Sequence, residues 1–292
     1  MHAVAEFARA GYRVIGLGRE ESRLDGASPP GLDAYTQMAL PSPKLAGFLS
    51  AEQPDVIVHA AGPASVAFSI EDPAADFEGT VTLLFGLLEA VRTCSPHSRV
   101  VILSSAAVYG NPKALPIAED APVSPVSPYG FHKQIAETTL REFHQVYGVR
   151  AAAARIFSAY GPGLRRQILW DVCEKASADN VSLFGTGDET RDFVHAEDVA
   201  YAIRTIAEGA PMSGEAYNVA SGVETRIHAL AEQLVACVRP GTPLEFSGVA
   251  RPGDPLRWRA DIAAIRSLGF TPRISLEQGV AEYCEWYRGV RG

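Results

Sequence analysis

The sequence predicts an α/β protein with a doubly wound parallel sheet and a second, smaller α+β lobe. Near-continuous apolar runs occur at residues 55–62 and 99–105, and such runs are typical of strands that helices cover on both faces. Helical patterns alternate with these strands, as in parallel sheets whose strands are joined by crossover helices. After Tyr160 the alternation ends and short strands mix with helices, which indicates the second lobe.

Local patterns predict the individual elements. Residues 1–10 are expected to form a helix, because apolar residues recur at a spacing of three to four and Gly11 follows. Residues 12–17 form a short segment with aromatic and β-branched residues, which predicts a strand. The first half is further expected to hold strands at 55–62, 99–105 and 149–157 and helices at 73–92 and 127–147. The second half is expected to hold strands at 181–184 and 216–219 and helices near 197–208, 226–238, 261–268 and 275–288.

The composition argues against several classes of protein. The chain has 292 residues, 47% of them hydrophobic, and a net charge of -8, which disfavours binding to a nucleic-acid backbone. Its four cysteines show no metal-ligand spacing, so we expect free thiols and no metal site. No apolar run approaches the ~18 residues of a membrane span. We therefore expect a cytoplasmic protein that binds neither nucleic acid nor membrane.

Three residues form a candidate catalytic group. Ser105 ends a predicted buried strand, and ligands of open parallel sheets bind beyond the carboxyl ends of the strands. Tyr129 and Lys133 open a predicted helix four residues apart, so their side chains share a face. A nearby ammonium is expected to lower the pKa of a tyrosine, ordinarily about 10, toward neutrality. A lone Tyr–Lys pair at this spacing is usually a solvated surface pair, but together with Ser105 it indicates acid–base chemistry.

Four motifs resemble those of the extended short-chain dehydrogenase/reductases, specifically the nucleotide-sugar epimerase/dehydratase group. They are SSAAVYG at 104–110, YGFHK at 129–133, RDFVHAEDVA at 191–200 and LGFTP at 268–272, and the resemblance covers essentially the whole chain. It implies that Tyr129 is the acid/base, that Lys133 holds the nicotinamide ribose and tunes Tyr129, and that Ser105 hydrogen-bonds the reacting oxygen.

The resemblance also implies a division of the chain and a set of ligands. Residues 1–157 and 193–222 would form a Rossmann-type cofactor domain, and residues 158–192 and 223–292 a substrate-binding lobe. The substrate would be a nucleotide-diphosphate sugar, and the protein a homodimer joined by a four-helix bundle. The expected cofactor-binding residues are Arg19, Ala60, Ala61, Gly62, Ser104, Tyr129, Lys133 and Ile156. The expected substrate-binding residues are Ser105, Ser158, Arg191 and Arg251.

The start of the chain departs from the family. Family members begin with a strand and a G-x-x-G-x-x-G turn that binds the cofactor pyrophosphate, and both are missing before the first predicted helix. The missing strand would be central, so two neighbouring strands would keep unpaired edges, and buried unpaired groups cost ~1–3 kcal/mol each. We therefore expect a mis-assigned start or a truncated chain; a true deletion with a rearranged sheet is the alternative.

Other departures bear on cofactor and reaction. Gly18 stands where an acidic residue would bind the ribose of NAD, and Arg19 could face the phosphate of NADP, so NADP(H) is favoured over NAD(H). Ala106 and Ala107 replace the Asp–Glu pair of the dehydratases, which leaves C4 epimerisation or reduction of a 4-keto sugar. A cofactor-free binding protein is the non-enzymatic alternative.

Two family asparagines are also replaced. Ser158 stands at one of these positions, which puts a phosphate contact in question, and Asp76 stands at the other, where it could disturb the helix that supports Tyr129. His59 and His195 lie in strand-like motifs and are expected to be structural.

Overall fold

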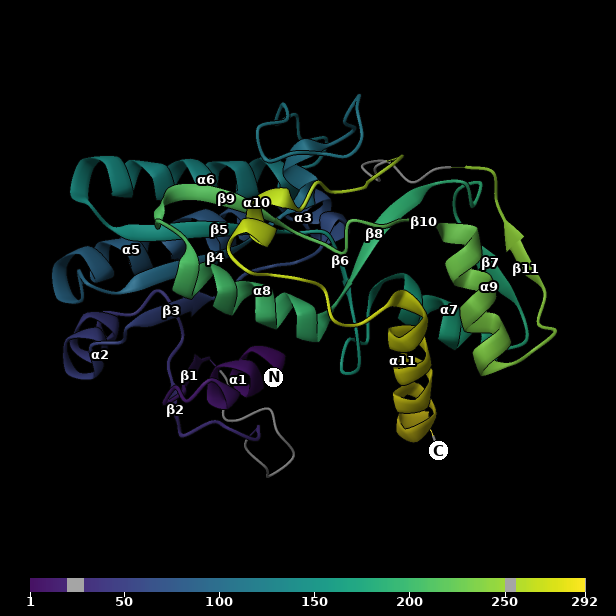
Figure 1. Cartoon of the computed structure of the whole chain (residues 1–292), viewed down its shortest axis with the longest axis horizontal. Coiled ribbons are helices and arrows are strands. Elements are labelled where there is room, and N and C mark those ends of the chain that lie inside the picture. The colour runs from purple at the N-terminus through teal and green to yellow at the C-terminus, as the bar shows by residue number, and fades with distance from the viewer. Residues whose placement is uncertain (20–28, 250–255, 292) are drawn as a thin grey trace.

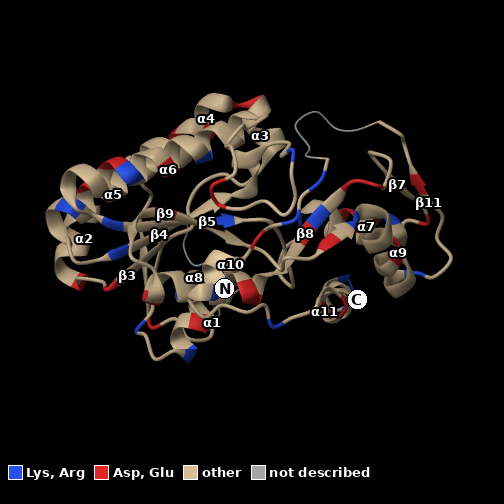
Figure 2. Cartoon of the chain, turned by 45° about the horizontal axis from the view of Figure 1, so that its top comes forward, with Lys and Arg blue, Asp and Glu red and all other residues tan. Residues whose placement is uncertain are grey.

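The computed structural model describes residues 1–19, 29–249 and 256–291. A four-stranded parallel sheet forms its centre, and α5 (Leu83–Cys94) and α6 (Pro128–Tyr147) lie on one face of this sheet, with α8 (Ala196–Gly209) on the other (Figure 1). The strand order is β3 (Val56–His59), β4 (Arg99–Ser105), β5 (Arg150–Ile156) and β9 (Ser213–Val219). Figure 2 shows the same three layers from a second angle. The predicted α/β class with a parallel sheet is confirmed.

The central strands owe their position to apolar and small side chains. In β4, Val100 and Val101 are fully buried, as expected for a strand covered on both faces. In the neighbouring β5, residues 151–154 are all alanine and all buried. Both strands run in parallel register, with Ser105 opposite Ile156 at their carboxyl ends. The sheet therefore delivers Ser105 to the edge where ligands of such folds bind.

The first two strands form a separate sheet. β1 (Ile15–Gly18) pairs in parallel with β2 (Ala34–Gln37), and no ladder joins β1 to β3 in the described part of the chain. The sequence did not predict β2 or α2 (Lys44–Glu52), which packs against α5.

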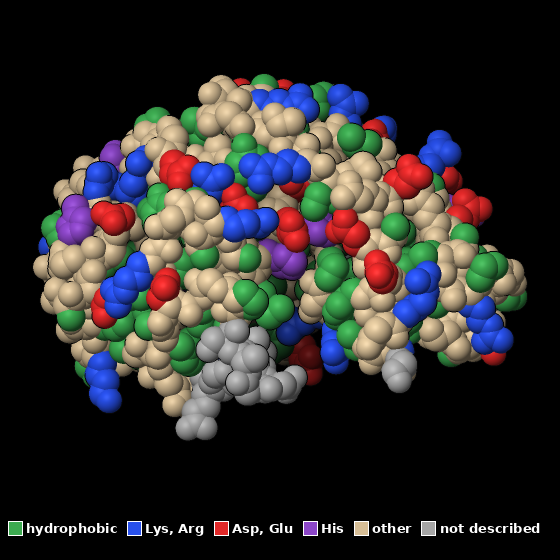
Figure 3. Space-filling model, turned by 60° about the horizontal axis from the view of Figure 1, so that its bottom comes forward, with side chains coloured by type: hydrophobic (Ala, Val, Ile, Leu, Met, Phe, Trp, Pro, Cys, Tyr) green, Lys and Arg blue, Asp and Glu red, His purple; other side chains and the backbone are tan. Residues whose placement is uncertain are grey.

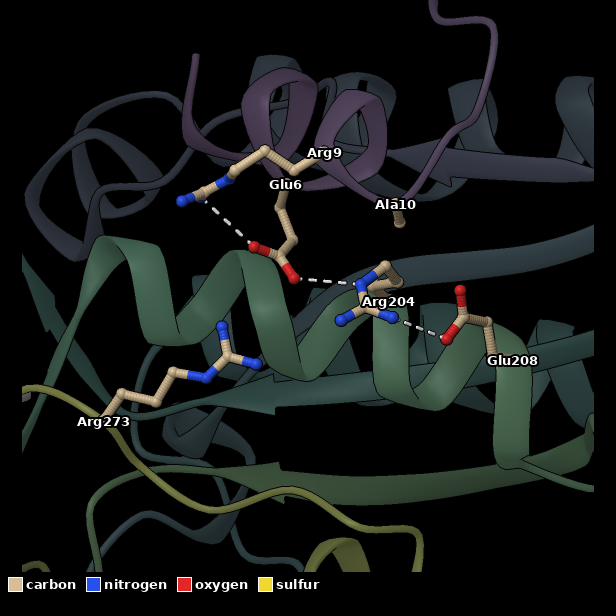
Figure 4. Close-up of a pocket in the computed structure, with 6 residues that line it drawn as sticks. All are labelled: Glu6, Arg9, Ala10, Arg204, Glu208 and Arg273. Carbon is tan, nitrogen blue, oxygen red and sulfur yellow. Dashed lines mark hydrogen bonds and ion pairs between the residues drawn. The ribbon is translucent and has the colours of Figure 1, made fainter.

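The N-terminal helix α1 (His2–Arg9) packs against α8. Glu6 is almost fully buried between them, and it accepts a hydrogen bond of 2.9 Å from Arg204 Nε and forms an ion pair with Arg9. These side chains border a cavity of about 380 Å³, which Figure 4 shows between the two helices. On the face shown in Figure 3, basic and acidic side chains are interspersed rather than gathered by sign.

The long helix predicted at 73–92 is divided in the structure. It consists of α4 (Pro73–Phe77), a π-helical turn η1 (Glu78–Thr82) and α5. The short helix α3 (Val66–Glu71) precedes it and was not predicted. At η1, a Cβ on Gly62 would lie 2.7 Å from the carbonyl oxygen of Gly79. The loop after β3 and the π-helical turn therefore approach each other closely, and π-helical turns are frequent at functional sites.

The second lobe has its own core. A three-stranded sheet contains β6 (Ser158–Tyr160), β8 (Thr190–His195) and β10 (Glu224–Arg226), and a two-stranded sheet contains β7 (Val181–Leu183) and β11 (Leu244–Phe246). Three helices, α7 (Gln167–Ser177), α9 (Ile227–Val238) and α11 (Leu276–Arg291), enclose a core that includes Val172, Leu230 and Tyr283. The sequence did not predict α7.

One segment packs differently from its expected place in the substrate-binding lobe. Trp258 and Phe270 join the core around the central sheet, together with Ile265 of α10 (Ala263–Ser267). Their large apolar side chains are buried there because α10 lies against α8 and β9. Residues 258–270 thus belong by packing to the larger lobe. No described helix has both the length and the apolar character needed to cross a membrane.

Candidate active site

Ser105 lies at the carboxyl end of β4, at the start of a tight turn. Its Oγ accepts a hydrogen bond of 3.2 Å from the backbone N–H of Ala107, which caps the 3₁₀ turn η2 (Ala106–Tyr109). Because a hydroxyl oxygen has capacity beyond this one bond, Ser105 can still bond a neighbouring hydroxyl.

The start of α6 places Tyr129 beside this turn. Ser127 caps the helix by accepting from the N–H of Gly130 at 3.3 Å, as N-terminal serines commonly do. The N–H of Tyr129 donates to Oγ of the buried Ser69 in α3 at 3.0 Å. A Cβ on Gly130 would lie 2.6 Å from the carbonyl oxygen of Ala107. The absence of a side chain at Gly130 therefore lets α6 approach η2.

The structure brings Ser105, Tyr129 and Lys133 together. The Ser105 side chain lies close enough to the Tyr129 hydroxyl to lower its pKa by hydrogen bonding. Lys133 Nζ donates to the carbonyl oxygen of Leu103 in β4 at 2.9 Å, and it lies 5.5 Å from the centre of the Tyr129 ring. A phenol, an ammonium and a strand-end hydroxyl thus share one site at the carboxyl edge of the sheet.

The electrostatics of this group differ from the expectation. Burial raises the pKa of Tyr129, the Ser105 hydrogen bond opposes this, and the Asp76 carboxylate adds to it. Burial also lowers the pKa of Lys133 to about 8, against the opposing effects of Asp76 and Glu137. The prediction that Lys133 brings the pKa of Tyr129 below its ordinary value is wrong for this structure, because the loss of hydration of the phenolate is the larger effect.

A buried ion pair behind the site was missed by the sequence analysis. Glu137 lies one helical turn beyond Lys133 and receives two hydrogen bonds from Arg155 of β5, at 2.8 and 3.0 Å. Arg155 also donates to the Tyr109 hydroxyl at 2.8 Å. The available signal was an arginine among the buried alanines of a strand, since a buried charge requires a partner.

This ion pair corrects the expectation for Ser104. The hydroxyl of Ser104 donates to Glu137 Oε1 at 2.6 Å, and the residue is only 3% exposed. Its side chain therefore points into the protein interior, where it bonds Glu137, and is not available to a cofactor.

Other predicted cofactor residues lie at the edge formed by the strand ends. Ala60, Ala61 and Gly62 follow β3 directly and are exposed, whereas Ile156 ends β5 and is half-buried. Arg19 follows β1, is exposed, and its carbonyl accepts from Gln37 Nε2 at 3.3 Å.

These strand-end residues fit a cofactor that the resemblance implies. Gly62 has a φ of +121° and allows the close approach of its loop to Gly79. The loop follows β3 at the same edge of the sheet as Ser105, which ends β4. The exposed backbone after β3 and the Lys133 ammonium are suited to the polar part of a nicotinamide nucleotide. Among the described residues, no cluster of three or more His, Cys, Asp or Glu is arranged for a metal ion.

The predicted substrate residues lie in the second lobe. Ser158 begins β6, opposite Phe193 of β8. Arg191 lies in β8, where it donates to the carbonyl of Thr190 and its guanidinium is 5.6 Å from the Trp258 ring. Arg251 lies outside the described residues.

The two histidines are placed inside the fold. His195 Nδ1 accepts from the N–H of Glu197 at 3.4 Å and caps α8, which agrees with a structural role. His59 ends β3, where burial and the Lys133 charge lower its pKa to about 4.

Comparisons with known proteins identify the family. The model of the NAD dependent epimerase/dehydratase family matches residues 1–220. A UDP-glucose 4-epimerase of Mycolicibacterium smegmatis is 32% identical over 293 residues, which cover 95% of this chain and 91% of that protein. A dTDP-glucose 4,6-dehydratase of Streptomyces niveus is 31% identical over 242 residues, covering 81% of this chain and 71% of its own. The structure of MoeE5 in complex with UDP-glucose and NAD has a TM-score of 0.88 and 26% identity, and the match covers 100% of this chain and 95% of that one. Together with the geometry of the strand-end site, these matches show that the chain belongs to the NAD-dependent epimerase/dehydratase family.

Proposed function

We propose that the protein is a nucleotide-sugar 4-epimerase that works by reversible hydride transfer with a nicotinamide cofactor. The observation that carries the proposal is the group formed by Ser105, Tyr129 and Lys133 at the carboxyl edge of the parallel sheet. Epimerisation is favoured over dehydration because the two positions after Ser105 hold alanine, which supplies neither acid nor base for elimination. The similarity to the UDP-glucose 4-epimerase of M. smegmatis supports a nucleoside diphosphate sugar as substrate.

The proposed mechanism assigns one task to each residue. When bound, the nicotinamide ring supplies a hydride acceptor and donor for C4 of the sugar. Tyr129 Oη takes the proton of the C4 hydroxyl and later returns it, and Ser105 Oγ hydrogen-bonds the same sugar oxygen. Lys133 would hold the cofactor ribose, and its positive charge would favour the Tyr129 phenolate against the opposing effect of burial. Ala60, Ala61 and Gly62, which are exposed directly after β3, would contact the cofactor.

The direct test is Tyr129→Phe, which removes the proton-transferring oxygen and keeps the ring. We expect epimerase turnover to fall by about 10²–10⁴-fold, while calorimetric binding of UDP-glucose changes little. Tyr147→Phe, an exposed tyrosine at the end of the same helix, is the matched control. A Tyr129→Phe enzyme with normal turnover would contradict the assignment.

A second candidate is an NADPH-dependent reductase of nucleotide 4-keto sugars. It is favoured by the end of β1, where Gly18 offers no carboxylate for the ribose hydroxyls of NAD and Arg19 follows directly. A reductase consumes one NADPH per sugar, whereas an epimerase shows no net change at the reduced-nicotinamide absorbance band. Arg19→Ala is expected to weaken NADP binding more than NAD binding.

We further propose that the protein is a homodimer through the outer face of α5 and α6. Three large apolar side chains on this face are exposed, namely Phe85, Phe131 and Ile135. Exposed apolar side chains gathered on one face commonly mark an interface between proteins when they form a patch.

A further inference from the structure

Asp76 of α4 is a buried carboxylate at the back of the catalytic helix. It is 0% exposed, and its Oδ2 lies 2.5 Å from Nδ1 of His132 in α6. Its Oδ1 is buried and has no hydrogen-bond partner within the described ranges. The ring of Phe77 packs edge-on against His132 at 5.3 Å. A buried carboxylate that uses only part of its hydrogen-bonding capacity is costly, so this position calls for an explanation.

The pair is joined directly to the proposed catalytic residues. His132 precedes Lys133 in the chain and lies on the same helix as Tyr129, so its bond to Asp76 ties α4 to the catalytic segment of α6. Asp76 acts electrostatically on both residues and raises the pKa of Lys133 and of Tyr129. Rather than disturbing the helix that supports Tyr129, the aspartate forms a bond to that helix.

Among the other charged groups around Lys133, Glu137 also raises its pKa, but less than Asp76 does. Glu137, on the next turn of α6, is held by two hydrogen bonds from Arg155 and one from Ser104, so its charge is largely compensated. His59 of β3 has a pKa of about 4 and is neutral near pH 7. From β4, Lys133 receives only the neutral carbonyl of Leu103 as a described hydrogen-bond partner. Asp76 thus differs from Glu137 in its ion-pair partner. Asp76 pairs with a histidine, His132, whereas Glu137 pairs with an arginine.

We propose that Asp76, oriented by His132, is a positioning residue whose negative charge keeps the Lys133 ammonium charged inside the site. The role of that ammonium in turnover rests on the proposed function, but the charge relation between Asp76 and Lys133 can be measured without turnover. The physical basis is that burial disfavours the ammonium, while a nearby negative charge favours it.

The experiment follows the ionisation of Lys133 in the full chain by carbon-13 NMR of labelled lysine ε-carbons. The sequence contains four lysines, Lys44, Lys113, Lys133 and Lys175, so each signal can be resolved, and the signal lost in Lys133→Arg assigns Lys133. In the unmodified protein we expect a midpoint near the pKa of about 8. In Asp76→Asn, which keeps an acceptor for His132 and removes the charge, we expect the midpoint to fall by roughly one pH unit.

The matched control is Asp72→Asn, the same substitution one turn earlier on an exposed helix cap. Asp72 Oδ1 accepts from the N–H of Ala75 at 3.0 Å, and asparagine caps helices equally well. In Asp72→Asn, the titration midpoint of Lys133 is expected to stay at the value of the unmodified protein. An unchanged midpoint in Asp76→Asn, or an equal shift in both variants, would overturn the proposal.

A second variant covers the case in which Asp76→Asn does not fold. Asp76→Asn combined with His132→Asn keeps two amides that can bond each other without a carboxylate, and the Lys133 midpoint is expected to fall by the same amount. If neither variant folds, the pair serves the fold rather than the charge, and the proposal is wrong. A shifted midpoint in a protein that epimerises no nucleotide sugar would contradict the proposed function and leave this inference standing.

Discussion

At the scale of single residues, the ionisation of Lys133 predicts how activity depends on pH. Its pKa is lowered to about 8 by burial, so the ammonium that we propose holds the cofactor ribose is lost as the pH rises through that value. We expect kcat/KM to decline above about pH 8. The measurement is a pH–rate profile of the unmodified enzyme beside Lys133→Arg, whose guanidinium stays charged. Residual activity of Lys133→Arg that declines at the same pH would show that another group titrates.

Because Glu137 and Arg155 form a buried ion pair, replacing one of the two residues is expected to cause a large loss of stability. Both side chains are about 5% exposed, so Glu137→Gln leaves a buried guanidinium without its counter-ion. We expect the free energy of unfolding in urea to fall by about 3–5 kcal/mol. Glu142→Gln, an exposed position on the same helix, is the control and should stay within about 0.5 kcal/mol. A loss below about 1 kcal/mol in Glu137→Gln would mean that Arg155 finds another partner.

At the scale of elements, the approach of α6 to η2 decides where Tyr129 lies. Gly130→Ala places a methyl group 2.6 Å from a backbone oxygen, and backbone cannot move aside as a flexible side chain does. We expect the helix to shift, the free energy of unfolding to fall by about 1–3 kcal/mol, and kcat to fall because Tyr129 moves from Ser105.

The control for this substitution is Gly86→Ala in α5. A Cβ on Gly86 meets nothing within 4 Å, and alanine favours a helix by about 0.5–1 kcal/mol over glycine. Gly86→Ala should therefore keep full activity and gain stability. A fully active Gly130→Ala enzyme would show that the contact between α6 and η2 does not position Tyr129.

At the scale of the whole molecule, the outer layer of α5 and α6 predicts the oligomeric state. Phe131 is 50% exposed and Phe85 is 49% exposed, and burying such side chains between two copies is favourable by roughly 1.5–3 kcal/mol each. Phe131→Glu is expected to convert the proposed dimer to a monomer in sedimentation velocity measurements at micromolar concentration. Val223→Glu, on an exposed residue outside this layer, should leave the dimer intact. A monomeric unmodified protein at that concentration would exclude the proposed interface.

Much of the fold could be predicted from periodicity. β4 spans residues 99–105 as expected, and α6 begins within one residue of the expected start. Both have strong patterns, because one is buried on both faces and the other on one face. β2 and α2 escaped prediction because they lie in or beside a stretch rich in proline, glycine and serine, whose local pattern is that of a loop.

The motifs located the candidate site, but its charges depended on three-dimensional neighbours. Ser105, Tyr129 and Lys133 could be brought together in advance because strand ends and a helix start have known places in a doubly wound sheet. The direction of the pKa shift of Tyr129 could not be predicted in this way, since it is the balance of burial, a hydrogen bond and a carboxylate on another helix. The bond between Asp76 and His132 joins residues 56 positions apart. Spacing along the chain shows which side chains share an element, whereas only packing shows which charges lie close enough to change one another's ionisation.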